Sequence, residues 1–483
     1  MVRRLREQGK GILFISHKFE EVFELTLASE LNRELYKDQH SLVIPFDQQL
    51  TKKFVDSLPF QLTDDQRKVA WQVFQDMESG TPMNRLVEGD VGSGKTVVAV
   101  LAALGAIQAG YQVAFMAPTE ILANQHAESM HKLLEILGFD EKIVLLTGSM
   151  PKSQKQYVYE SIENGEAQLV IGTHAVFQDS VTFDSLGLVI VDEQHRFGVE
   201  QRKKLLSKAK EHPHVLSMTA TPIPRSLALA LYGEMDVSVI AQMPPGRKPV
   251  NTDIWIPENR EKLYRHVARA LDAGRQAFVV CPQIEEDEAG RLSVKKIHNQ
   301  LSKKWLKNYT VSLLHGKMKA DEKDAIMQDF AAGKIQVLVS TTVIEVGVNV
   351  PNASVMVIEG ADKFGLAQIH QLRGRVGRGS DEAYCYLVLT ENSEPSKRLK
   401  MLERETNGFK LAEYDLEVRG PGAIYGTMQH GELDLRVAKL TDVALIEAAR
   451  SAAKQFIQKR EDLVKYPQLK ARVDTLRTVT NLN

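Results

Sequence analysis

The stretch Gly89-Asp90-Val91-Gly92-Ser93-Gly94-Lys95-Thr96 decides the fold of this chain. It fits the phosphate-loop pattern G-x-x-x-x-G-K-[ST], with a predicted strand over 85–88 before it and an apolar helical run over 97–107 after it. In that setting the glycines let backbone N–H groups turn toward phosphates, and the helix N-terminus adds partial positive charge. Lys95 can then reach the β- and γ-phosphates of a nucleotide, and the Thr96 hydroxyl can hold Mg²⁺. The alternative, a chance match in a glycine-rich turn, does not explain why a strand and a helix flank the loop.

Short apolar runs alternate with helical stretches around this loop, from about 84 to 240. The runs are apolar almost throughout, as expected for strands that are buried on both faces of a parallel sheet. A second series of the same kind extends from about 252 to 392, after a Pro- and Gly-rich linker at 243–249. We therefore predict an α/β fold of two tandem RecA-like P-loop domains, each a parallel sheet with helices on both faces. The predicted strands are 85–88, 112–117, 142–146, 169–172, 188–191 and 215–218, then 277–281, 311–314, 337–340, 355–358 and 384–389.

The remaining segments have the pattern of helices. Apolar residues at helical spacing predict helices over 17–40 and about 47–57, and Thr63 can cap a helix that begins near Asp64. The chain becomes helical and charged again from about 395. The predicted domains are a helical N-terminal segment (1–57), an ATP-binding RecA-like domain (58–242), a second RecA-like domain (243–395) and a helical C-terminal region (396–483).

Two carboxylates, Asp192 and Glu193, follow the buried strand predicted at 188–191. In a P-loop fold we expect such a strand beside the phosphate loop. Asp192 can then hold Mg²⁺, and Glu193 can orient or deprotonate the attacking water. Two solvated acids at the end of a strand are the alternative. His195 either couples the ATP site to the second domain or is a structural histidine.

A run rich in glycine and arginine, Gln368-Ile369-His370-Gln371-Leu372-Arg373-Gly374-Arg375-Val376-Gly377-Arg378-Gly379, lies in the second α/β series. Arg375 and Arg378 are spaced i, i+3, so a helical turn would place them on one side. Arginine can stabilise the charge that spreads over a transferring phosphoryl group. The alternative is a basic patch that binds phosphate or RNA. If these arginines complete the ATP site, nucleotide binding closes the two domains and hydrolysis opens them.

Composition is that of an ordinary soluble protein, with 43% hydrophobic and 25% charged residues, and the length of 483 residues suggests about three domains. Lys and Arg number 61 against 62 Asp and Glu, so the formal charge of −1 gives no global nucleic-acid signature. The two cysteines, Cys281 and Cys385, form no disulfide or zinc framework. The longest apolar run, 97–107, is too short to span a membrane, and we expect a cytoplasmic protein.

Several turns that follow predicted strands carry small hydroxyl residues. Hydroxyl and backbone N–H groups at strand ends can bind DNA phosphates without reading sequence. Each turn alone fits an ordinary loop, but their repetition in both halves favours a shared DNA-binding surface. The turns are 117–120, 147–149, 172–174, 314–317 and 340–342.

The order of these motifs resembles that of superfamily 2 helicases, and most closely the bacterial RecG family. Residues 58–63 with Gln66 are similar to the adenine-side motif, 192–199 to the Mg²⁺ motif, and 219–225 to the motif that links hydrolysis to DNA. Residues 343–348 and 371–378 are similar to the last two motifs. The resemblance implies ATP and Mg²⁺ as cofactors. The implied catalytic residues are Lys95, Asp192, Glu193, Gln371, Arg375 and Arg378; the implied nucleotide ligands are Phe60, Gln66, Gly89, Asp90, Val91, Gly92, Ser93, Gly94, Lys95, Thr96, Glu345 and Gly347; the implied metal ligands are Thr96 and Asp192.

The resemblance extends beyond the motor. Residues 409–422 are similar to the translocation motif shared by RecG and the transcription-repair coupling factor, which in that family relays motor closure to a hairpin moving along duplex DNA. The box Asp192-Glu193-Gln194-His195 favours RecG over the coupling factor. About 58 residues precede the adenine-side motif, so we expect the OB-fold wedge of RecG proteins to be missing. Asn349 stands where the family often has Asp, and we expect little from this difference.

Together these features imply an ATP-dependent DNA helicase or translocase that acts on duplex or branched DNA without sequence preference. We expect a monomer, with a single-strand-binding protein as a candidate partner. The alternative is an ATP-dependent clamp or adaptor that binds DNA without productive unwinding, because the wedge is expected to be absent. A small-molecule P-loop kinase does not account for the second α/β series or for 371–378.

Overall fold

The computed structural model of the chain describes residues 17–37, 39–139, 142–222, 235–282, 293–341, 350–379, 381–419 and 442–480. The chain divides into two compact units. The larger unit comprises residues 38–223 and 237–415 and contains two parallel sheets. The smaller unit comprises residues 1–37, 224–236 and 416–482.

The first sheet of the larger unit has seven strands in the order β3-β4-β2-β5-β6-β1-β7. Neighbouring strands from β3 to β1 run parallel, and nearly all their residues are buried. Alternate residues enter hydrophobic clusters on opposite faces, as with Phe115 on one face and Ala114 and Met116 on the other. The strands are β1 (Asn84–Gly89), β2 (Gln112–Met116), β3 (Ile143–Leu146), β4 (Leu169–Gly172), β5 (Leu186–Val191), β6 (His214–Thr219) and β7 (Asp236–Ile240).

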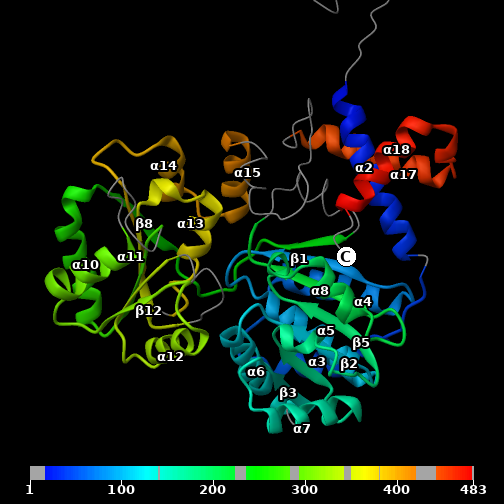
Figure 1. Ribbon diagram of the computed structural model, residues 1–483, viewed down its shortest axis with the longest axis horizontal. Helices are drawn as coiled ribbons and strands as arrows, with labels where there is room; N and C mark the ends of the chain where they lie inside the picture. Colours follow the sequence, from blue (N-terminus) through cyan, green and yellow to red (C-terminus); the bar gives the residue numbers. More distant parts are fainter. Residues whose placement is uncertain are drawn as a thin grey trace, which may run out of the picture. The chain divides into compact units, whose positions relative to one another are not determined.

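Helices cover both faces of this sheet (Figure 1). One hydrophobic cluster is supplied by α3 (Gln48–Ser57), α4 (Asp64–Glu78), α5 (Lys95–Gln108) and α6 (Glu120–Leu134). The opposite cluster includes side chains of α7 (Lys152–Glu163) and α8 (Val199–Leu206). We call this part of the larger unit the first lobe. The predicted cap at Thr63 is present, because its Oγ1 accepts a hydrogen bond from the Gln66 backbone at 3.2 Å.

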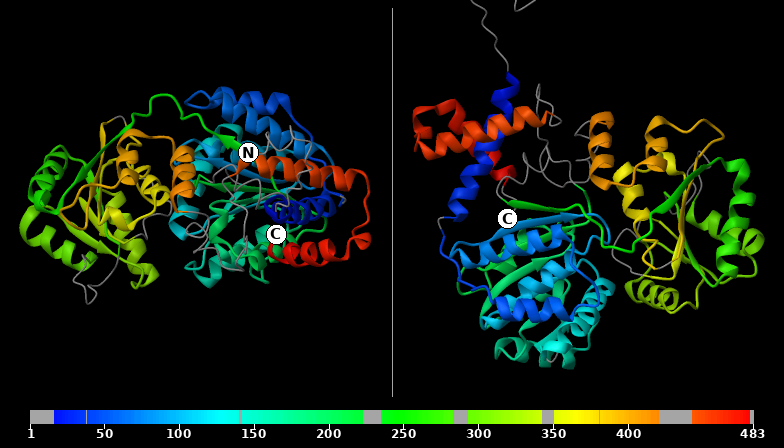
Figure 2. Two further views of the ribbon diagram at one scale, coloured as in Figure 1. Left: turned by 90° about the horizontal axis from the view of Figure 1, so that it is seen from above. Right: turned by 180° about the vertical axis from the view of Figure 1, so that it is seen from behind.

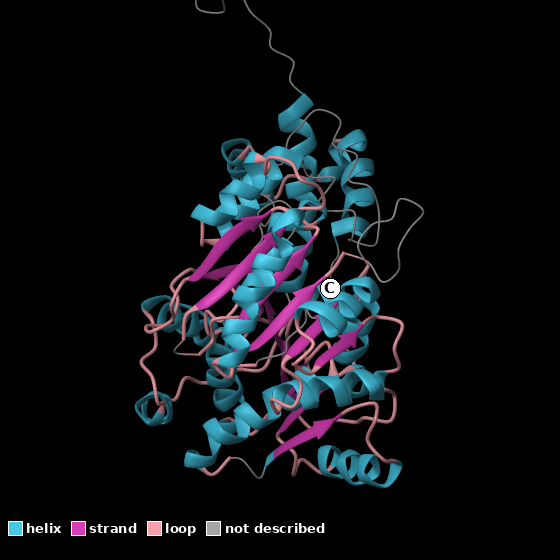
Figure 3. Ribbon diagram, turned by 90° about the vertical axis from the view of Figure 1, so that its left-hand side faces the viewer, coloured by secondary structure: helices cyan, strands magenta, loops and turns pink. Residues whose placement is uncertain are grey.

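The second sheet has six strands in the order β10-β11-β9-β12-β13-β8, and all neighbouring pairs run parallel. Helices α10 (Arg260–Asp272) and α11 (Val294–Gln300) pack on one face, while α12 (Ala320–Ala331), α13 (Leu366–Arg373) and α14 (Lys397–Arg404) pack on the other. Figure 3 shows the strands of the sheets layered between helices. We call this part the second lobe. Its strands are β8 (Val250–Trp255), β9 (Gln276–Val280), β10 (Val311–Leu314), β11 (Val337–Ser340), β12 (Ala353–Glu359) and β13 (Ala383–Val388).

The prediction of two parallel α/β sheets is therefore confirmed, but it missed the edge strands β7 and β8. Both strands lie at the edge of a sheet, where fewer side chains are buried: β7 has two buried residues and β8 has none. Neither strand is therefore a continuous apolar run. β8 begins at Val250, close to the predicted start of the second series near 252. Residues 241–249 connect β7 to β8, and the predicted boundary between 242 and 243 falls in this connector. The boundaries of the four predicted domains remain predictions.

The smaller unit is helical. Helices α2 (His17–Lys37), α17 (Val443–Gln458) and α18 (Pro467–Thr480) share a hydrophobic cluster, and Figure 2 shows α2, in blue, against the two orange and red helices. Two buried glutamates of α2 pair with arginines of the other helices: Glu24 with Arg472 at 3.0 Å, and Glu30 with Arg450 at 2.6 Å. Among the described residues, no helix is long and apolar enough to cross a bilayer.

Candidate nucleotide site

The phosphate loop joins β1 to α5, as predicted. Gly92 and Gly94 have φ values of 80° and 84°, in the left-handed region that favours glycine. A Cβ on Gly94 would collide with the Gln66 side chain, so the close approach of α4 requires glycine here. The glycines thus leave a backbone cradle at the N-terminus of α5, which is the local structure that a phosphate needs.

Gln66 holds the phosphate loop in place. Its Nε2 donates a hydrogen bond to the Ser93 carbonyl at 2.8 Å, and its Oε1 accepts one from the Thr63 backbone at 2.9 Å. The side chain is 2% exposed. The start of α4 and the loop are therefore fixed to one another. Phe60, the other residue predicted on the adenine side, is 45% exposed.

Lys95 lies at the centre of the charged groups of the site. Its Nζ donates to the carbonyls of Gly89 at 2.7 Å and Asp90 at 3.1 Å. Burial lowers the pKa of Lys95, and the negative charges of Glu193 and Asp192 oppose that effect. Thr96 follows in the first turn of α5 and is partly buried.

Asp192 and Glu193 follow β5, and their charges act on Lys95 of the phosphate loop, although β5 does not pair with β1. Strand β6 lies between β5 and β1 in the sheet. At the carboxyl ends of the strands, the turn after β6 therefore lies between the acidic pair and the phosphate loop. Glu193 has a φ of 51°, which is unusual for a residue with a side chain. Its Oε2 accepts a hydrogen bond from the Ala220 backbone at 3.1 Å, so the turn after β6 fixes its direction.

The two carboxylates have opposite pKa shifts. Burial raises the pKa of Glu193, and the neighbouring charge of Asp192 raises it further. Burial also acts to raise the pKa of Asp192, but the hydrogen bond and charge of His126, the charge of Lys95 and the hydrogen bond from the Glu193 backbone together outweigh it, so the net shift is downward. Asp192 is thus kept ionised, whereas Glu193 is the better proton acceptor, in line with the roles predicted for them.

His126 is a residue of this site that the sequence analysis missed. It lies on α6, with Nε2 2.9 Å from Asp192 Oδ2, and its ring packs on Phe115 with 4.6 Å between centroids. Helix α6 follows β2, which pairs with β5, so its residues come close to the end of β5. That neighbourhood depends on the strand order, which the sequence pattern did not contain.

Helix α13 of the second lobe ends at Arg373, before the two predicted arginines. The expected helical turn through Arg375 and Arg378 is therefore wrong, because Gly374 caps the helix and Gly377 adopts a φ of 73°. Arg375 is buried, and its charge lowers the pKa of both Lys95 and Glu193. Burial, together with the charges of Arg375 and Arg247, lowers the pKa of Arg378 to about 9.

Three contacts join the two lobes beside the phosphate loop. Gln371 Nε2 donates to Thr221 Oγ1 at 2.5 Å, and His370 Nε2 lies 2.6 and 2.7 Å from the two carboxylate oxygens of Asp90. A Cβ on Gly374 would lie 2.8 Å from the Val91 Cβ, which shows how closely the backbones approach. We call this boundary the seam, with residues 89–96 on one wall and 370–378 on the other. His370, like His126, was not among the predicted site residues.

A buried chain of hydrogen bonds leads from the seam to the segment before α15 (Gly408–Arg419). Arg373 donates to His370 Nδ1 at 2.7 Å and to the carbonyls of Leu402 at 2.8 Å and Glu405 at 3.1 Å. Since a guanidinium can only donate, Nδ1 accepts and Nε2–H donates to Asp90.

The other end of α13 is also tied to α15. The Asp415 carboxylate of α15 accepts a hydrogen bond from the Leu366 backbone, the first residue of α13, at 3.3 Å. α13 is thus held at both ends by the segment 402–415, which overlaps the predicted translocation motif. Residues 420–422 of that motif lie outside the described residues.

Some predicted site residues lie outside the part of the chain that the structure describes. These are residues 342–349, with Glu345, Gly347 and Asn349, residues 223–225, and the side chain of His195. Their predicted roles are untested. In the first lobe, turns predicted to bind DNA do come together, because Glu120 accepts hydrogen bonds from the Ser149 backbone at 3.0 Å and hydroxyl at 2.5 Å.

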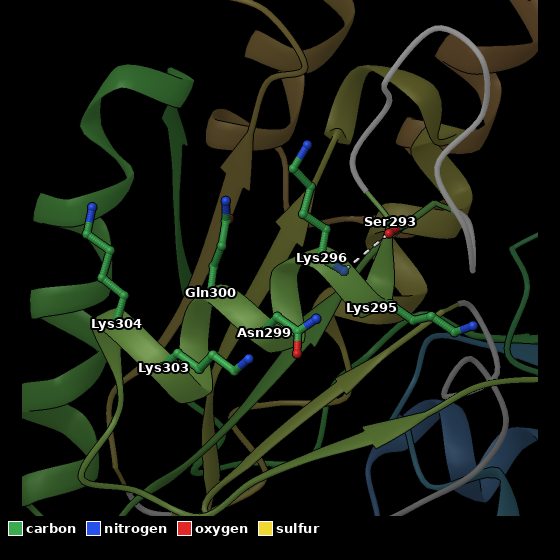
Figure 4. A pocket seen from close by; sticks show the side chains of 7 residues that line it. All are labelled: Ser293, Lys295, Lys296, Asn299, Gln300, Lys303 and Lys304. Carbon is green, nitrogen blue, oxygen red and sulfur yellow. Dashed lines mark hydrogen bonds between the residues drawn. The ribbon is translucent and has the colours of Figure 1, made fainter.

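Outside the seam, an open hollow lies along one side of α11 and the turn that follows it (Figure 4). Four lysines and no carboxylate line it, so it concentrates positive charge on a chain whose formal charge is −1. Its lining residues are Ser293, Lys295, Lys296, Asn299, Gln300, Lys303 and Lys304.

The residues of the seam, together with Asp192 after β5, fit a nucleoside triphosphate with Mg²⁺. The cradle at Gly92 and Gly94 suits phosphate oxygens, and the carboxylate of Asp192 and hydroxyl of Thr96 are oxygen ligands of the kind that Mg²⁺ prefers. Arg375 brings positive charge from the opposite wall.

Family models match three successive parts of the chain. Residues 65–229 match DEAD/DEAH box helicase, 258–380 match the helicase conserved C-terminal domain, and 405–481 match ATP-dependent DNA helicase RecG, domain 3, C-terminal. Mss116p bound to ssRNA and AMP-PNP is 15% identical with a TM-score of 0.55, over 89% of this chain and 94% of that chain, and shares the fold.

Curated relatives named ATP-dependent DNA helicase RecG match almost the whole chain. The protein of Synechocystis sp. is 46% identical over 94% of this chain and 55% of its own length, and that of Streptococcus pneumoniae serotype 4 is 49% identical over 90% and 65%. A structure of RecG bound to a three-way DNA junction is 41% identical with a TM-score of 0.77, covering 94% of this chain and 57% of that chain. The chain thus spans 55% to 65% of the length of these curated relatives. On this evidence, the chain belongs to the RecG family of ATP-dependent DNA helicases.

Proposed function

We propose that this chain is a motor that hydrolyses ATP in the seam and uses the resulting movement of its lobes to travel on duplex or branched DNA. The observation that carries the proposal is the seam itself. A phosphate loop and an acidic pair lie on the first lobe, and arginine, histidine and glutamine side chains from the second lobe reach the same place. A nucleotide bound there would contact both lobes, so that its hydrolysis changes how tightly they hold together.

We assign the residues of the seam the following roles. Residues 89–96 hold the phosphates, with Lys95 on the β- and γ-phosphates, and Gln66 and Phe60 lie on the adenine side. Thr96 and Asp192 hold Mg²⁺, which neutralises phosphate charge when it is bound. Glu193 takes the proton of the attacking water, which its raised pKa favours.

The second wall completes the assignment. Arg375 and Arg378 stabilise the charge that develops on the transferred phosphoryl group, an effect worth about 10³ to 10⁵ in rate where it applies. Gln371 links this wall to the turn after β6. Glu345 and Gly347 are proposed nucleotide ligands from their resemblance to the family motif.

We propose that α13 transmits closure of the seam to the translocation motif. The support is the chain of hydrogen bonds from Asp90 through His370 and Arg373 to the carbonyls of Leu402 and Glu405. These groups are buried and directional, so a shift of α13 against the phosphate loop would be felt at the start of α15.

The proposed substrate is DNA with a branch. Its support is the relative whose structure is that of RecG bound to a three-way DNA junction, together with the local positive charge of the α11 hollow. We further propose that the protein acts as a monomer in the cytoplasm, with a single-strand-binding protein as a candidate partner.

The proposal is tested by measuring ATP hydrolysis and DNA strand displacement in the variant Lys95→Ala. We expect DNA-stimulated ATP hydrolysis to fall by about 10² to 10³ or more, because a charge aimed at the phosphates is lost. Lys132→Ala, an exposed lysine of α6, is the matched control and should hydrolyse ATP normally. Unchanged hydrolysis in Lys95→Ala would rule out this site.

The DNA substrate is tested with a four-way junction, a fork, plain duplex and single strand, each assayed for hydrolysis and for displacement. We expect the branched molecules to stimulate hydrolysis most and to be remodelled. Hydrolysis without displacement on any of them would favour the clamp or adaptor instead.

A further inference from the structure

The connector between the lobes, residues 241–249, delivers a side chain into the seam. Arg247 is partly buried, although its neighbours Gly246 and Lys248 are exposed. Its Nη1 donates a hydrogen bond to the Val91 carbonyl in the phosphate loop. Its Nη2 donates to the Gly374 carbonyl on the second wall at 3.3 Å. One guanidinium therefore bridges backbone groups of both walls.

The fit of Arg247 against the phosphate loop is tight. A Cβ on Gly92 would collide with Nη1, so the glycine makes room for this guanidinium. Arginine suits the position because its planar group carries five donors in a fixed fork and can serve two carbonyls at once. A lysine ammonium is a compact point charge and would reach one carbonyl or the other.

The position of the bridge relates it to the predicted arginines. Gly374 is the residue before Arg375, so the hydrogen bond from Arg247 holds the backbone directly before Arg375. The charge of Arg375 in turn affects the pKa values of Lys95 and Glu193. Arg247 also belongs to the same cluster of charge, because its charge and that of Arg375 lower the pKa of Arg378. Three arginines in one buried place repel one another, and the phosphates of a nucleotide would relieve that repulsion.

We propose that Arg247 is a positioning residue of the ATP site, which clamps the phosphate loop to the end of α13 so that Arg375 and Arg378 reach the nucleotide. The proposal rests on the proposed ATPase function and adds a role for the connector. Because the clamp contacts backbone on both walls, it acts when the lobes are closed and is released when they separate. The connector then does more than join the lobes.

The first test separates positioning from binding. In Arg247→Ala we expect kcat for DNA-stimulated ATP hydrolysis to fall about 10- to 100-fold, while the Kd for a fluorescent ADP analogue changes less than about threefold. Arg247→Lys should not restore kcat, because a single ammonium cannot bridge two carbonyls. Lys248→Ala, the exposed neighbour in the same connector, should behave as wild type.

The second test measures closure directly. Fluorescent dyes on Glu163→Cys in the first lobe and Lys307→Cys in the second report the distance between lobes, because native Cys281 and Cys385 are buried and should not be labelled. A non-hydrolysable ATP analogue should raise energy transfer in the otherwise wild-type protein. With Arg247→Ala the rise should be smaller at saturating analogue.

The outcomes distinguish this inference from the proposed function. Wild-type kcat and wild-type energy transfer in Arg247→Ala would overturn the clamp and leave the ATPase assignment intact, provided that Lys95→Ala is inactive. An active Lys95→Ala would overturn both. If Arg247→Ala fails to fold by circular dichroism, Arg247→Gln and Arg247→Lys carry the test, and wild-type kcat in either folded variant overturns the bridge.

Discussion

At the scale of single residues, the environment of each carboxylate decides what it can do. Asp192 and Glu193 are adjacent in the sequence, yet a histidine stabilises the charge of one while burial disfavours the charge of the other. The hydrogen bond and charge of His126 are the largest effects that lower the pKa of Asp192, and the charge of Lys95 adds to them. If Asp192 holds Mg²⁺ as proposed, His126 is a group that orients a metal ligand, and loss of such a group typically weakens metal binding by about 10- to 100-fold.

We expect His126→Ala to raise the Mg²⁺ concentration for half-maximal ATP hydrolysis by about 10- to 100-fold, because Asp192 loses the group that orients it. Electron paramagnetic resonance of bound Mn²⁺ should show weaker binding as well. His131→Ala, an exposed histidine of the same helix, is the control. Equal metal dependence in the two variants would contradict the role of His126.

Glu88, at the end of β1, gives the fold a dependence on pH. It is 2% exposed, and burial raises its pKa to about 8 from the ordinary 4.5. Between those values the folded protein keeps a proton that the unfolded chain releases, so stability falls as pH rises, by up to about 1.4 kcal/mol per pH unit. Above about pH 8 both states are ionised and the loss is complete.

Glu88→Gln should remove this dependence, because an amide has no proton to release in this range. The Tm of the variant relative to wild type should rise steadily from pH 5 to 8 and then level off, as measured by circular dichroism. Glu163→Gln, an exposed glutamate of α7, should show a flat difference. A flat difference for Glu88→Gln would mean that this carboxyl is ionised in the folded protein.

At the scale of elements, α13 contributes both to the candidate site and to its proposed coupling. Its C-terminal end reaches the phosphate loop through His370 and Gly374, while its N-terminal end is capped by Asp415 of α15. A carboxylate at a helix N-terminus stabilises the helix by satisfying a free N–H and by opposing the helix dipole. These contacts link α13 to the segment that overlaps the predicted translocation motif.

We expect Asp415→Ala to reduce strand displacement about tenfold more than ATP hydrolysis, because the lost cap, worth about 1 kcal/mol, loosens α13 from α15. Both activities would be measured on the same fork. Glu413→Ala, an exposed residue of α15, serves as the control. A proportional loss of both activities would argue that Asp415 supports the fold and not the coupling.

At the scale of the whole molecule, the smaller unit ties the start of the described chain to its end. Glu30 of α2 is 3% exposed and pairs with Arg450 of α17, 420 positions away. Removing Glu30 leaves the guanidinium of Arg450, whose side chain is 18% exposed, without its carboxylate, at a cost below the roughly 3 kcal/mol of a fully buried pair. The pair therefore matters more for stability than its surface counterparts do.

Glu30→Ala should lower the Tm of the smaller unit in a thermal scan, whereas Glu34→Ala, an exposed glutamate of the same helix, should not. The double variant Glu30→Met with Arg450→Met should recover most of the loss, because no unpaired charge remains. If the double variant is no more stable than Glu30→Ala, the attraction between Glu30 and Arg450 itself stabilises the unit, and the unpaired charge does not explain the loss.

The sequence by itself determined the phosphate loop, the acidic pair, eleven of the strands and the helical ends, because these depend on short-range patterns. A glycine-rich turn between a strand and a helix, or four apolar residues before two acids, is complete within a few residues. The edge strands β7 and β8 were not predicted, because fewer of their side chains are buried and their apolar pattern is weaker.

Only the tertiary structure decided which distant groups meet. The order of strands places β6 between β5 and β1, brings His126 to Asp192, and sets Glu193 against Ala220. The packing of the lobes brings His370 to Asp90, 280 positions apart, and lets Arg247 reach across from a connector whose pattern indicates a linker. Such contacts leave no periodic trace in the sequence, because they arise from how whole sheets and lobes close on one another.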